Sequence, residues 1–549
     1  MVRTVSVSKL ALMKFILLIA LSFFSDPYPK NENISVSHYV FRLELSDDTN
    51  VIKGEAEVTV RFLKPVESFD LNLIGKKGDS TGMQVISVKS SGKPANYKFH
   101  DDLITIVPPP GKEHTFVIRY EGIPSDGLII SKNKFGERSF FGDNWPDRGR
   151  HWLPTVDHPF YKSTVEFLIT APSHYEVIAT GKLVEEKNLK GNRKLTHWKE
   201  SVPVSVKVMT IGVSNFAIQQ SGVVTGIPVT TWVYPQNQKE GFSDFSVAPR
   251  ILEYLQEYIG PYPFEKLAHV QSKTRFGGLE NASNIFYFEN SVNGRNEREG
   301  LIAHETAHQW FGNSATEADW HHVWLSEGFA TYCTALYMEH VYGRDTLTSL
   351  MNEMRKQVFD FDKKNMHPIV DTTITDINKV LSTHTYQKAA WVLHMLRRQM
   401  GDENFHAGIR EYYDTYKGRT ALTKDFIAIM QKHYSKVKLP APFIPDLSPF
   451  VRQWLYTGGH PKIRGTWEYH ENEKKLVLDT STTGITLTPL DPPIALELLI
   501  ETDDGEKVLK SVEVIGGTGR QLWDFPKKIV RVTADPGAWL LAEVYLEAK

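Results

Sequence analysis

Cysteine is almost missing from this sequence, since its 549 residues include only Cys333. One thiol cannot form an intramolecular disulfide, so the fold is expected to rest on side-chain packing and not on covalent cross-links. Cys333 falls among Ala330, Ala335 and Leu336 in a helical pattern. A small buried hydrophobic residue is expected at this position, with a catalytic thiol as the alternative.

The sequence also lacks an excess of charge of either sign. Its 63 basic and 65 acidic residues give a formal net charge of -2, a balance that provides no basic surface for the backbone of a nucleic acid. Nucleic acid is therefore not expected as a partner. The chain is longer than one hydrophobic core normally organises, so three or four domains are expected.

Long hydrophobic runs are missing as well, because no stretch approaches the roughly 18 consecutive apolar residues of a membrane-spanning helix. A shorter apolar run, FILLIALSFF, follows Lys14 and is typical of a secretory signal. We expect residues 1–25 to be this signal, and the protein to be exported to the periplasm or the extracellular space and soluble after cleavage. The alternatives are an uncleaved membrane anchor or a mis-assigned start, since a start at Met13-Lys14 would make a tidier signal peptide. The alternative locations are the membrane and the cytoplasm.

The apolar pattern divides the remaining chain into three parts. Short runs of period-two alternation predict an amino-terminal antiparallel β domain over residues 28–218. Helical periodicity dominates residues 219–458. Alternation then returns over residues 459–549, where Ile494 and Leu496 face one way and Asp504 begins a turn, and predicts a β-sandwich. The expected fold class is therefore a multidomain α+β protein.

The most informative segment is residues 301–328, LIAHETAHQWFGNSATEADWHHVWLSEG. Residues four apart lie on one face of a helix, so His304 and His308 present their imidazoles to one point, as a tetrahedral zinc requires. This helix is expected to finish after Phe311, and a second helix can then deliver Glu327. Two histidines and one glutamate leave a fourth position for water, and Glu305 lies beside it as a general base. A chance occurrence of HExxH is the alternative, which the downstream glutamate makes less plausible.

Gly277 and Gly278 interrupt a strand-like stretch, KLAHVQSKTRFGGLENASNIFYF. The pair could form a plain turn. In an edge strand, however, glycines let another backbone approach closely, so a peptide could add as a further strand. Glu280 would then lie where that peptide ends.

HETAHQWFGN, WLSEGFATY and GGLEN together resemble the motifs of the zinc aminopeptidases of peptidase family M1, and the resemblance extends over essentially the whole chain. It implies a thermolysin-like, mainly helical catalytic domain and one Zn²⁺ per chain held by His304, His308 and Glu327. It also implies peptide substrates with a free amino terminus. Leu279 stands where the family commonly has Met. Since the sequence stops after the predicted sandwich, a short form without the long helical carboxy-terminal domain of many M1 enzymes is expected.

The resemblance implies roles for three further residues. Glu280 would bind the free α-amino group of the substrate. Tyr386, in a Tyr-x-Lys pattern at the start of a helix, would stabilise the oxyanion, although helix packing alone could explain it. Asp143 stands where many family members have Gln or Glu that helps to hold the substrate amino terminus; a single gap would transfer this role to Asn144, and a turn cap is the other reading.

Three rival functions remain open. A zinc endopeptidase would use the same chemistry, but a carboxylate at Glu280 that closes the cleft suits a charged terminus. A binding scaffold without activity would have no need of His304, Glu305, His308, Glu327 and Tyr386 together. The third rival is the epoxide hydrolase activity of one M1 branch.

Overall fold

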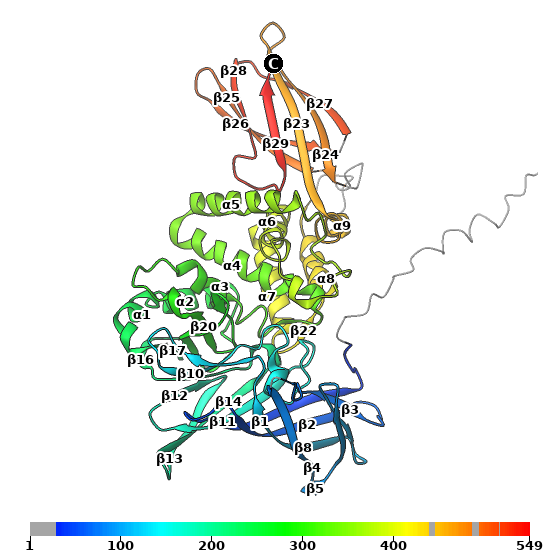
Figure 1. The fold of residues 1–549 in the computed structure, drawn as a ribbon. Coiled ribbons are helices and arrows are strands. Elements are labelled where there is room, and N and C mark those ends of the chain that lie inside the picture. The colour runs from blue at the N-terminus through cyan, green and yellow to red at the C-terminus, as the bar shows by residue number, and fades with distance from the viewer. Residues whose placement is uncertain (1–28, 79, 439–444, 486–493, 515–516) are drawn as a thin grey trace, which may run out of the picture.

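The computed structural model describes residues 29–78, 80–438, 445–485, 494–514 and 517–549. Figure 1 shows a β-rich amino-terminal region, a middle region of helices, and a carboxy-terminal β-sandwich that stands on the helices. The predicted α+β fold class is confirmed. The predicted signal, residues 1–25, lies outside the described residues, and the predicted domain boundaries stay predictions.

The amino-terminal region is built on one large twisted sheet with the order β13-β14-β11-β1-β2-β8-β4-β5. Alternate residues of its strands are buried, as in β11, because one face of the sheet covers the core. Most neighbours are antiparallel, but β1 and β11 run parallel from His38↔Thr164 to Glu44↔Thr170. Alternation alone cannot distinguish these two arrangements.

The strands of this region have the following bounds: β1 Ile34–Glu44, β2 Ile52–Phe62, β3 Phe69–Asn72, β4 Gly82–Ser90, β5 Lys93–Pro94, β6 Asn96–His100, β7 Leu103–Val107, β8 Glu113–Ile123, β9 Leu128–Lys132, β10 Arg138–Gly142, β11 Ser163–Pro172, β12 Glu176–Ala179, β13 Lys182–Leu189, β14 Arg193–Val204 and β15 Ile211–Ser214. Strands β12, β15, β10 and β9 form a second sheet, and β3, β7 and β6 form a third.

A five-stranded sheet begins the middle region, with the order β16-β17-β18-β20-β19. Its strands are β16 Ala217–Val224, β17 Ile227–Val233, β18 Leu267–Ser272, β19 Gly278–Leu279 and β20 Asn284–Phe288. β19 is the last strand of this sheet, so the glycine pair lies at a sheet edge. The short strands β21 Thr316–Glu317 and β22 Thr420–Ala421 pair with each other elsewhere in this region.

The helices of the middle region are α1 Gln238–Asp244, α2 Ala248–Tyr258, α3 Glu299–Ala307, α4 Trp324–Tyr342, α5 Arg344–Asp362, α6 Ala389–Met400, α7 Asp402–Tyr416, α8 Thr423–Tyr434 and α9 Ser448–Leu455. α4 is buried on almost every side over its first three turns, as expected of a central helix. Gly343 and Gly401 adopt φ of 88° and 77° and end α4 and α6 in a conformation that favours glycine. No helix among the described residues is both long and apolar enough to cross a membrane.

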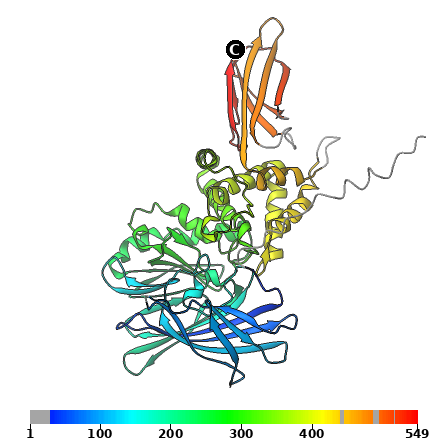
Figure 2. The ribbon, with the colours of Figure 1, turned by 45° about the vertical axis from the view of Figure 1, so that its right-hand side comes forward.

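The carboxy-terminal region consists of two packed sheets, β27-β24-β23-β29 and β26-β25-β28. Their bounds are β23 Gly459–His470, β24 Lys475–Ile485, β25 Ile494–Thr502, β26 Lys507–Val514, β27 Gly517–Asp524, β28 Ile529–Ala534 and β29 Glu543–Ala548. Ile494, Leu496, Leu498 and Ile500 of β25 are all buried, as the alternation predicts. Figure 2 shows this sandwich above the helical layer from a second side.

Candidate active site

Two helices bring three potential metal ligands together. His304 lies near the end of α3, His308 directly follows α3, and Glu327 lies in the first turn of α4. The Nε2 atoms of the two histidines are 3.1 Å apart, and Glu327 Oε2 lies 3.5 Å from His304 Nε2 and 3.2 Å from His308 Nε2. This is the only group of three or more such side chains that converges in this way among the described residues.

The donor set fits a zinc ion. Bonds of about 2.0–2.1 Å to a tetrahedral zinc place neighbouring ligand atoms roughly 3.3 Å apart, in agreement with the three separations above. His308 Nδ1 lies 3.1 Å from the carbonyl oxygen of Phe311 and 3.0 Å from Ser326 Oγ. A carbonyl only accepts hydrogen bonds, so the proton of a neutral His308 ring belongs on Nδ1 and the lone pair of Nε2 points to the site.

The local electrostatics favour a positive charge at this point. Burial lowers the pKa of a histidine, but the Glu327 carboxylate, with Glu280 and Glu305, outweighs this effect and raises the pKa of His308 to about 10. Burial also opposes ionisation of Glu327, yet His308 and His304 hold the pKa of Glu327 well below its usual range. Apart from its ion-pair contacts with the two histidines, the buried Glu327 Oε2 has no hydrogen-bond partner among the described residues, as expected of a carboxylate oxygen that can bind a metal ion.

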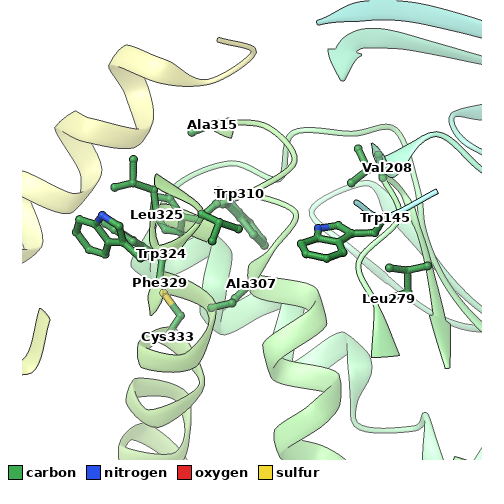
Figure 3. Close-up of a cluster of buried hydrophobic side chains, with 14 of the residues drawn as sticks. Trp145, Val208, Leu279, Ala307, Trp310, Ala315, Trp324, Leu325, Phe329 and Cys333 are labelled. Carbon is green, nitrogen blue, oxygen red and sulfur yellow. The ribbon is translucent and has the colours of Figure 1, made fainter. Parts of the chain in front are cut away.

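A layer of buried aromatic and aliphatic side chains holds α3 and α4 together. In Figure 3, Trp324 and Phe329 of α4 lie on one side of Trp310, the third residue after α3. Trp145 of the amino-terminal region and Leu279 of β19 lie on the other side, and all of these side chains are buried. Cys333 belongs to the same buried cluster, and burial raises the pKa of its thiol to about 12, so the prediction that this cysteine is buried is confirmed.

Glu305 points from α3 toward the edge strand β19. A Cβ atom added to Gly278 would lie 2.3 Å from Glu305 Oε1 and 2.5 Å from Glu305 Cδ. The carboxylate therefore lies directly against the glycine backbone. Burial raises the pKa of Glu305 well above its usual range; Glu280 and Glu327 add to this rise, whereas His308 opposes it.

Glu280 directly follows the edge strand, and its Oε1 atom is buried without a hydrogen-bond partner in the described residues. Two residues of the HETAHQWFGN segment hold its backbone. The Gln309 side-chain amide donates to the carbonyl oxygen of Glu280 at 3.0 Å and accepts from the Ser283 N–H at 2.9 Å, and Asn313 Nδ2 donates to the same carbonyl at 2.5 Å. The sequence analysis missed Gln309 and Asn313, whose only signal was their place in the motif.

Tyr386 lies in a π-helical turn, His384–Lys388, that leads into α6. Its ring stacks on His304 with centroids 6.0 Å apart and an angle of 17° between the planes. Burial raises the pKa of the phenol well above 10, and the carboxylates of Glu327, Glu280 and Glu305 add to this rise. The hydroxyl thus keeps its proton and remains a hydrogen-bond donor beside the site.

Asp143 differs from Glu280 because its carboxylate already has partners. It is fully buried and forms an ion pair with Arg148, and its second oxygen accepts from Thr274 Oγ1 at 3.2 Å and from the Arg275 N–H at 3.1 Å. The side chain of Asn144 is hydrogen-bonded as well. Its Nδ2 donates to the carbonyl oxygens of Val206 and Met209, and its Oδ1 accepts from Trp152 Nε1. The Asp143 side chain therefore holds the loop before β19, and a role of either residue in substrate binding stays a prediction.

The expected helix over residues 301–311 is shorter in the structure. α3 ends at Ala307, and the next residues form hydrogen bonds between residues three apart, as in a 3₁₀ turn. The Gln309 N–H donates to Thr306 O and the Trp310 N–H donates to Ala307 O, both at 3.1 Å. His308 therefore caps the helix. This tighter turn directs the Gln309 side chain to the loop after Glu280.

Comparison with known proteins gives matches over both large regions. The family model for the peptidase M1 N-terminal domain matches residues 35–206, and the model for the peptidase family M1 domain matches residues 244–454. "Probable aminopeptidase 2" of Sulfurisphaera tokodaii is 26% identical over 70% of this chain and 50% of its own length. Human glutamyl aminopeptidase is 26% identical over 64% of this chain and 37% of its own length.

The fold is also found among solved structures. The crystal structure of Legionella pneumophila aminopeptidase A in complex with aspartic acid matches with a TM-score of 0.78 and 16% identity, over 94% of this chain and 60% of that chain. At this identity the match shows the fold alone. The chain spans about half or less of the length of the two curated relatives above.

Proposed function

Because this chain belongs to peptidase family M1, we propose that it is a zinc-dependent aminopeptidase that releases the amino-terminal residue of peptides. One observation carries this proposal: a set of three metal donors lies in the same site as Glu280, a carboxylate with a buried, unpartnered oxygen at the end of an edge strand. Such a carboxylate needs a cationic partner, and the α-ammonium group of a peptide provides one.

His304, His308 and Glu327 would hold the zinc ion. Bound there, zinc would polarise the scissile carbonyl and lower the pKa of a bound water. Glu305, packed against Gly278, would take the proton of the attacking water and pass it to the leaving amine. The Tyr386 hydroxyl would donate a hydrogen bond to the carbonyl oxygen as negative charge develops on it.

The edge strand would bind the substrate backbone. β19 has β20 on one side and is the last strand of its sheet among the described residues, so a peptide can add to it as a further strand. Gly278 allows the close approach, Gly277 precedes it, and Glu280 would accept hydrogen bonds from the substrate ammonium group. Asp143 would contribute indirectly, by holding the Thr274-Arg275 backbone that leads into β19.

The experiment compares one aminoacyl-coumarin substrate with its amino-acetylated form, on the wild type, Glu280→Gln and Glu297→Gln. The wild type should hydrolyse only the free-amino form, lose activity with a chelator and regain it with zinc. Glu280→Gln keeps the shape but removes the charge, and a hydrogen bond to a charged group contributes about 1.5–3 kcal/mol, so kcat/KM should fall roughly 10- to 150-fold.

Glu297 is the matched control, because it is an exposed glutamate whose hydrogen-bond partner among the described residues is Asn293. Its variant should retain wild-type kcat/KM. Equal hydrolysis of the acetylated substrate by the wild type would favour the endopeptidase reading. Full activity in protein shown by elemental analysis to contain no metal would exclude the zinc mechanism altogether.

A further inference from the structure

The turn that carries Tyr386 is held from both of its ends. His384 lies two residues before Tyr386 and is fully buried, and its Nε2 atom lies 2.6 Å from Asp362 Oδ1. Lys388 lies two residues after Tyr386 and is also fully buried, and its Nζ donates to the carbonyl oxygen of Gly459 at 3.0 Å. The tyrosine thus sits midway between two buried polar anchors.

Both anchors lead to the same place, the start of the carboxy-terminal sandwich. Asp362 is the last residue of α5, and its second carboxylate oxygen lies 2.5 Å from His460 Nδ1. His460 directly follows Gly459 in β23. The Asp362 carboxylate therefore bridges His384, at one end of the Tyr386 turn, to His460 of β23. Lys388, at the other end of the turn, binds Gly459, the residue before His460.

The chain of contacts continues into the sandwich. His460 Nε2 lies 2.9 Å from Glu543 Oε1 in β29, the parallel neighbour of β23, and Lys462 Nζ lies 2.9 Å from the same oxygen. The His460 ring also stacks on Phe359 of α5 with centroids 4.2 Å apart. The two ring nitrogens of His460 thus face one carboxylate each, Asp362 and Glu543, and link them.

These contacts are buried and therefore well suited to fix a position. His384, Asp362 and His460 are at most 4% exposed, so water cannot readily replace a lost partner. Backbone hydrogen bonds join the turn to the residues before it, among them Tyr386 N–H to Ser382 O at 3.2 Å and Lys388 N–H to Thr383 O at 3.0 Å. A π-helical turn is less stable than a regular α-helix, and the side-chain anchors hold it in place.

We propose that the carboxy-terminal sandwich sets the position of the Tyr386 hydroxyl through the chain Glu543, His460, Asp362 and His384, together with Lys388 and Gly459. The positioning residues do not touch the substrate; they act through Tyr386. The catalytic consequence rests on the proposed function, whereas the structural coupling does not depend on it.

The kinetic test is a double-mutant cycle between His460→Phe and Tyr386→Phe. His460→Phe keeps a ring against Phe359 but removes both hydrogen bonds, and it should lower kcat about 10-fold with KM and zinc content nearly unchanged. Tyr386→Phe should lower kcat roughly 100- to 1000-fold. If His460 acts through Tyr386, the double variant should be no slower than Tyr386→Phe.

Two further variants guard against a general loss of folding. Glu543→Gln changes the partly exposed outer end of the chain of contacts and should give a smaller fall in kcat without a change in melting temperature. His470→Phe is the matched control, because His470 is the last residue of the same strand and its acidic neighbours in the described part of the chain are Glu468 and Glu473. It should leave kcat unchanged. An additive double variant, or a His460→Phe kcat within twofold of the wild type, would overturn the proposal.

A spectroscopic test needs no turnover. With 3-fluorotyrosine at position 386, His460→Phe should shift or broaden the ¹⁹F resonance, and His470→Phe should not. An unchanged resonance in His460→Phe would refute the coupling even in an active enzyme. A wild type that shows the coupling but hydrolyses no peptide would instead refute the proposed function.

Discussion

At the scale of single residues, Gly278 shows why a missing side chain matters in this site. Sequence reasoning offered a plain turn or the close approach of a substrate strand. The structure adds a nearer reason, since Glu305 lies against this glycine and a Cβ would overlap its carboxylate, at 2.3 Å from Oε1. The position of Glu305, the proposed base, therefore depends on the absence of a side chain at Gly278 of the edge strand.

Gly278→Ala should displace the Glu305 carboxylate and lower kcat about 10- to 100-fold, because a displacement near 1 Å can cost about 100-fold in rate. Gly300→Ala in α3 is the control: its added Cβ would meet only Met338 Cε at 3.5 Å, and alanine favours the helix. It should keep kcat and raise the melting temperature slightly. Wild-type kcat in Gly278→Ala would show that Glu305 does not depend on this contact.

At the scale of elements, the segment between α3 and α4 is held by two lysines of the amino-terminal region, Lys162 and Lys207. Lys162 Nζ donates to Asn313 O, Ser314 O and Thr316 Oγ1 at 2.7, 2.6 and 2.9 Å. Burial lowers the pKa of Lys162 to about 7, and nearby Lys207 adds to this effect. Since the segment joins His308 to Glu327, these lysines help to set where the two ligand-bearing helices meet.

Lys207 and Glu317 form an ion pair at 2.5 Å with side chains at most 1% exposed. Lys207→Met leaves the glutamate buried without its partner and should lower the free energy of unfolding by about 3–5 kcal/mol. Lys207→Met/Glu317→Leu should recover most of this loss, because no buried charge remains. Urea unfolding measures both.

The exposed pair Lys417 and Asp414 is the control for that series, with side chains 57% and 65% exposed. Lys417→Met should cost less than about 1 kcal/mol. An equal loss in the buried and exposed lysine variants would contradict the role assigned to Lys207.

At the scale of the whole molecule, several histidines are buried in their neutral form. Burial lowers the pKa of His269 to about 3, of His322 to about 4, of His384 to about 4 and of His394 to about 3. In the unfolded chain a histidine titrates near 6.5. Below that pH the unfolded state binds more protons than the folded state, so the stability should fall as the pH drops from about 6.5 toward 4.

His269→Phe tests one such histidine, because phenylalanine can keep the stacking of the ring on Phe245 and Tyr287. Among the described residues, the His269 ring has one hydrogen-bond partner, Tyr287 Oη, which lies 2.9 Å from Nδ1. The advantage of the wild type in unfolding free energy should shrink by up to about 1.4 kcal/mol per pH unit below 6.5. Urea unfolding of metal-free protein at several pH values measures this slope. The exposed His100 is the control; a constant difference between wild type and His269→Phe would contradict the prediction.

The sequence by itself determined whatever depends on local geometry. The four-residue spacing of His304 and His308 follows from the helix repeat, and the alternation in Leu496 and Leu498 follows from the strand repeat. The roles expected for Glu280 and Tyr386 came from the resemblance to the motifs of family M1, and both side chains lie near the candidate metal ligands in the structure. These features depend on dihedral preferences and short segments, so they can be read from neighbouring residues.

Only the tertiary structure decided which distant residues meet. No local pattern pairs β1 with β11 in parallel, places Lys207 on Glu317, or joins Asp362 to His460 across 98 positions of the chain. Such contacts depend on how sheets and helices close over long loops and pack, and many pairings share the same local sequence. The candidate metal ligands were therefore visible in the sequence, whereas the contacts that hold them in place became visible only in the folded chain.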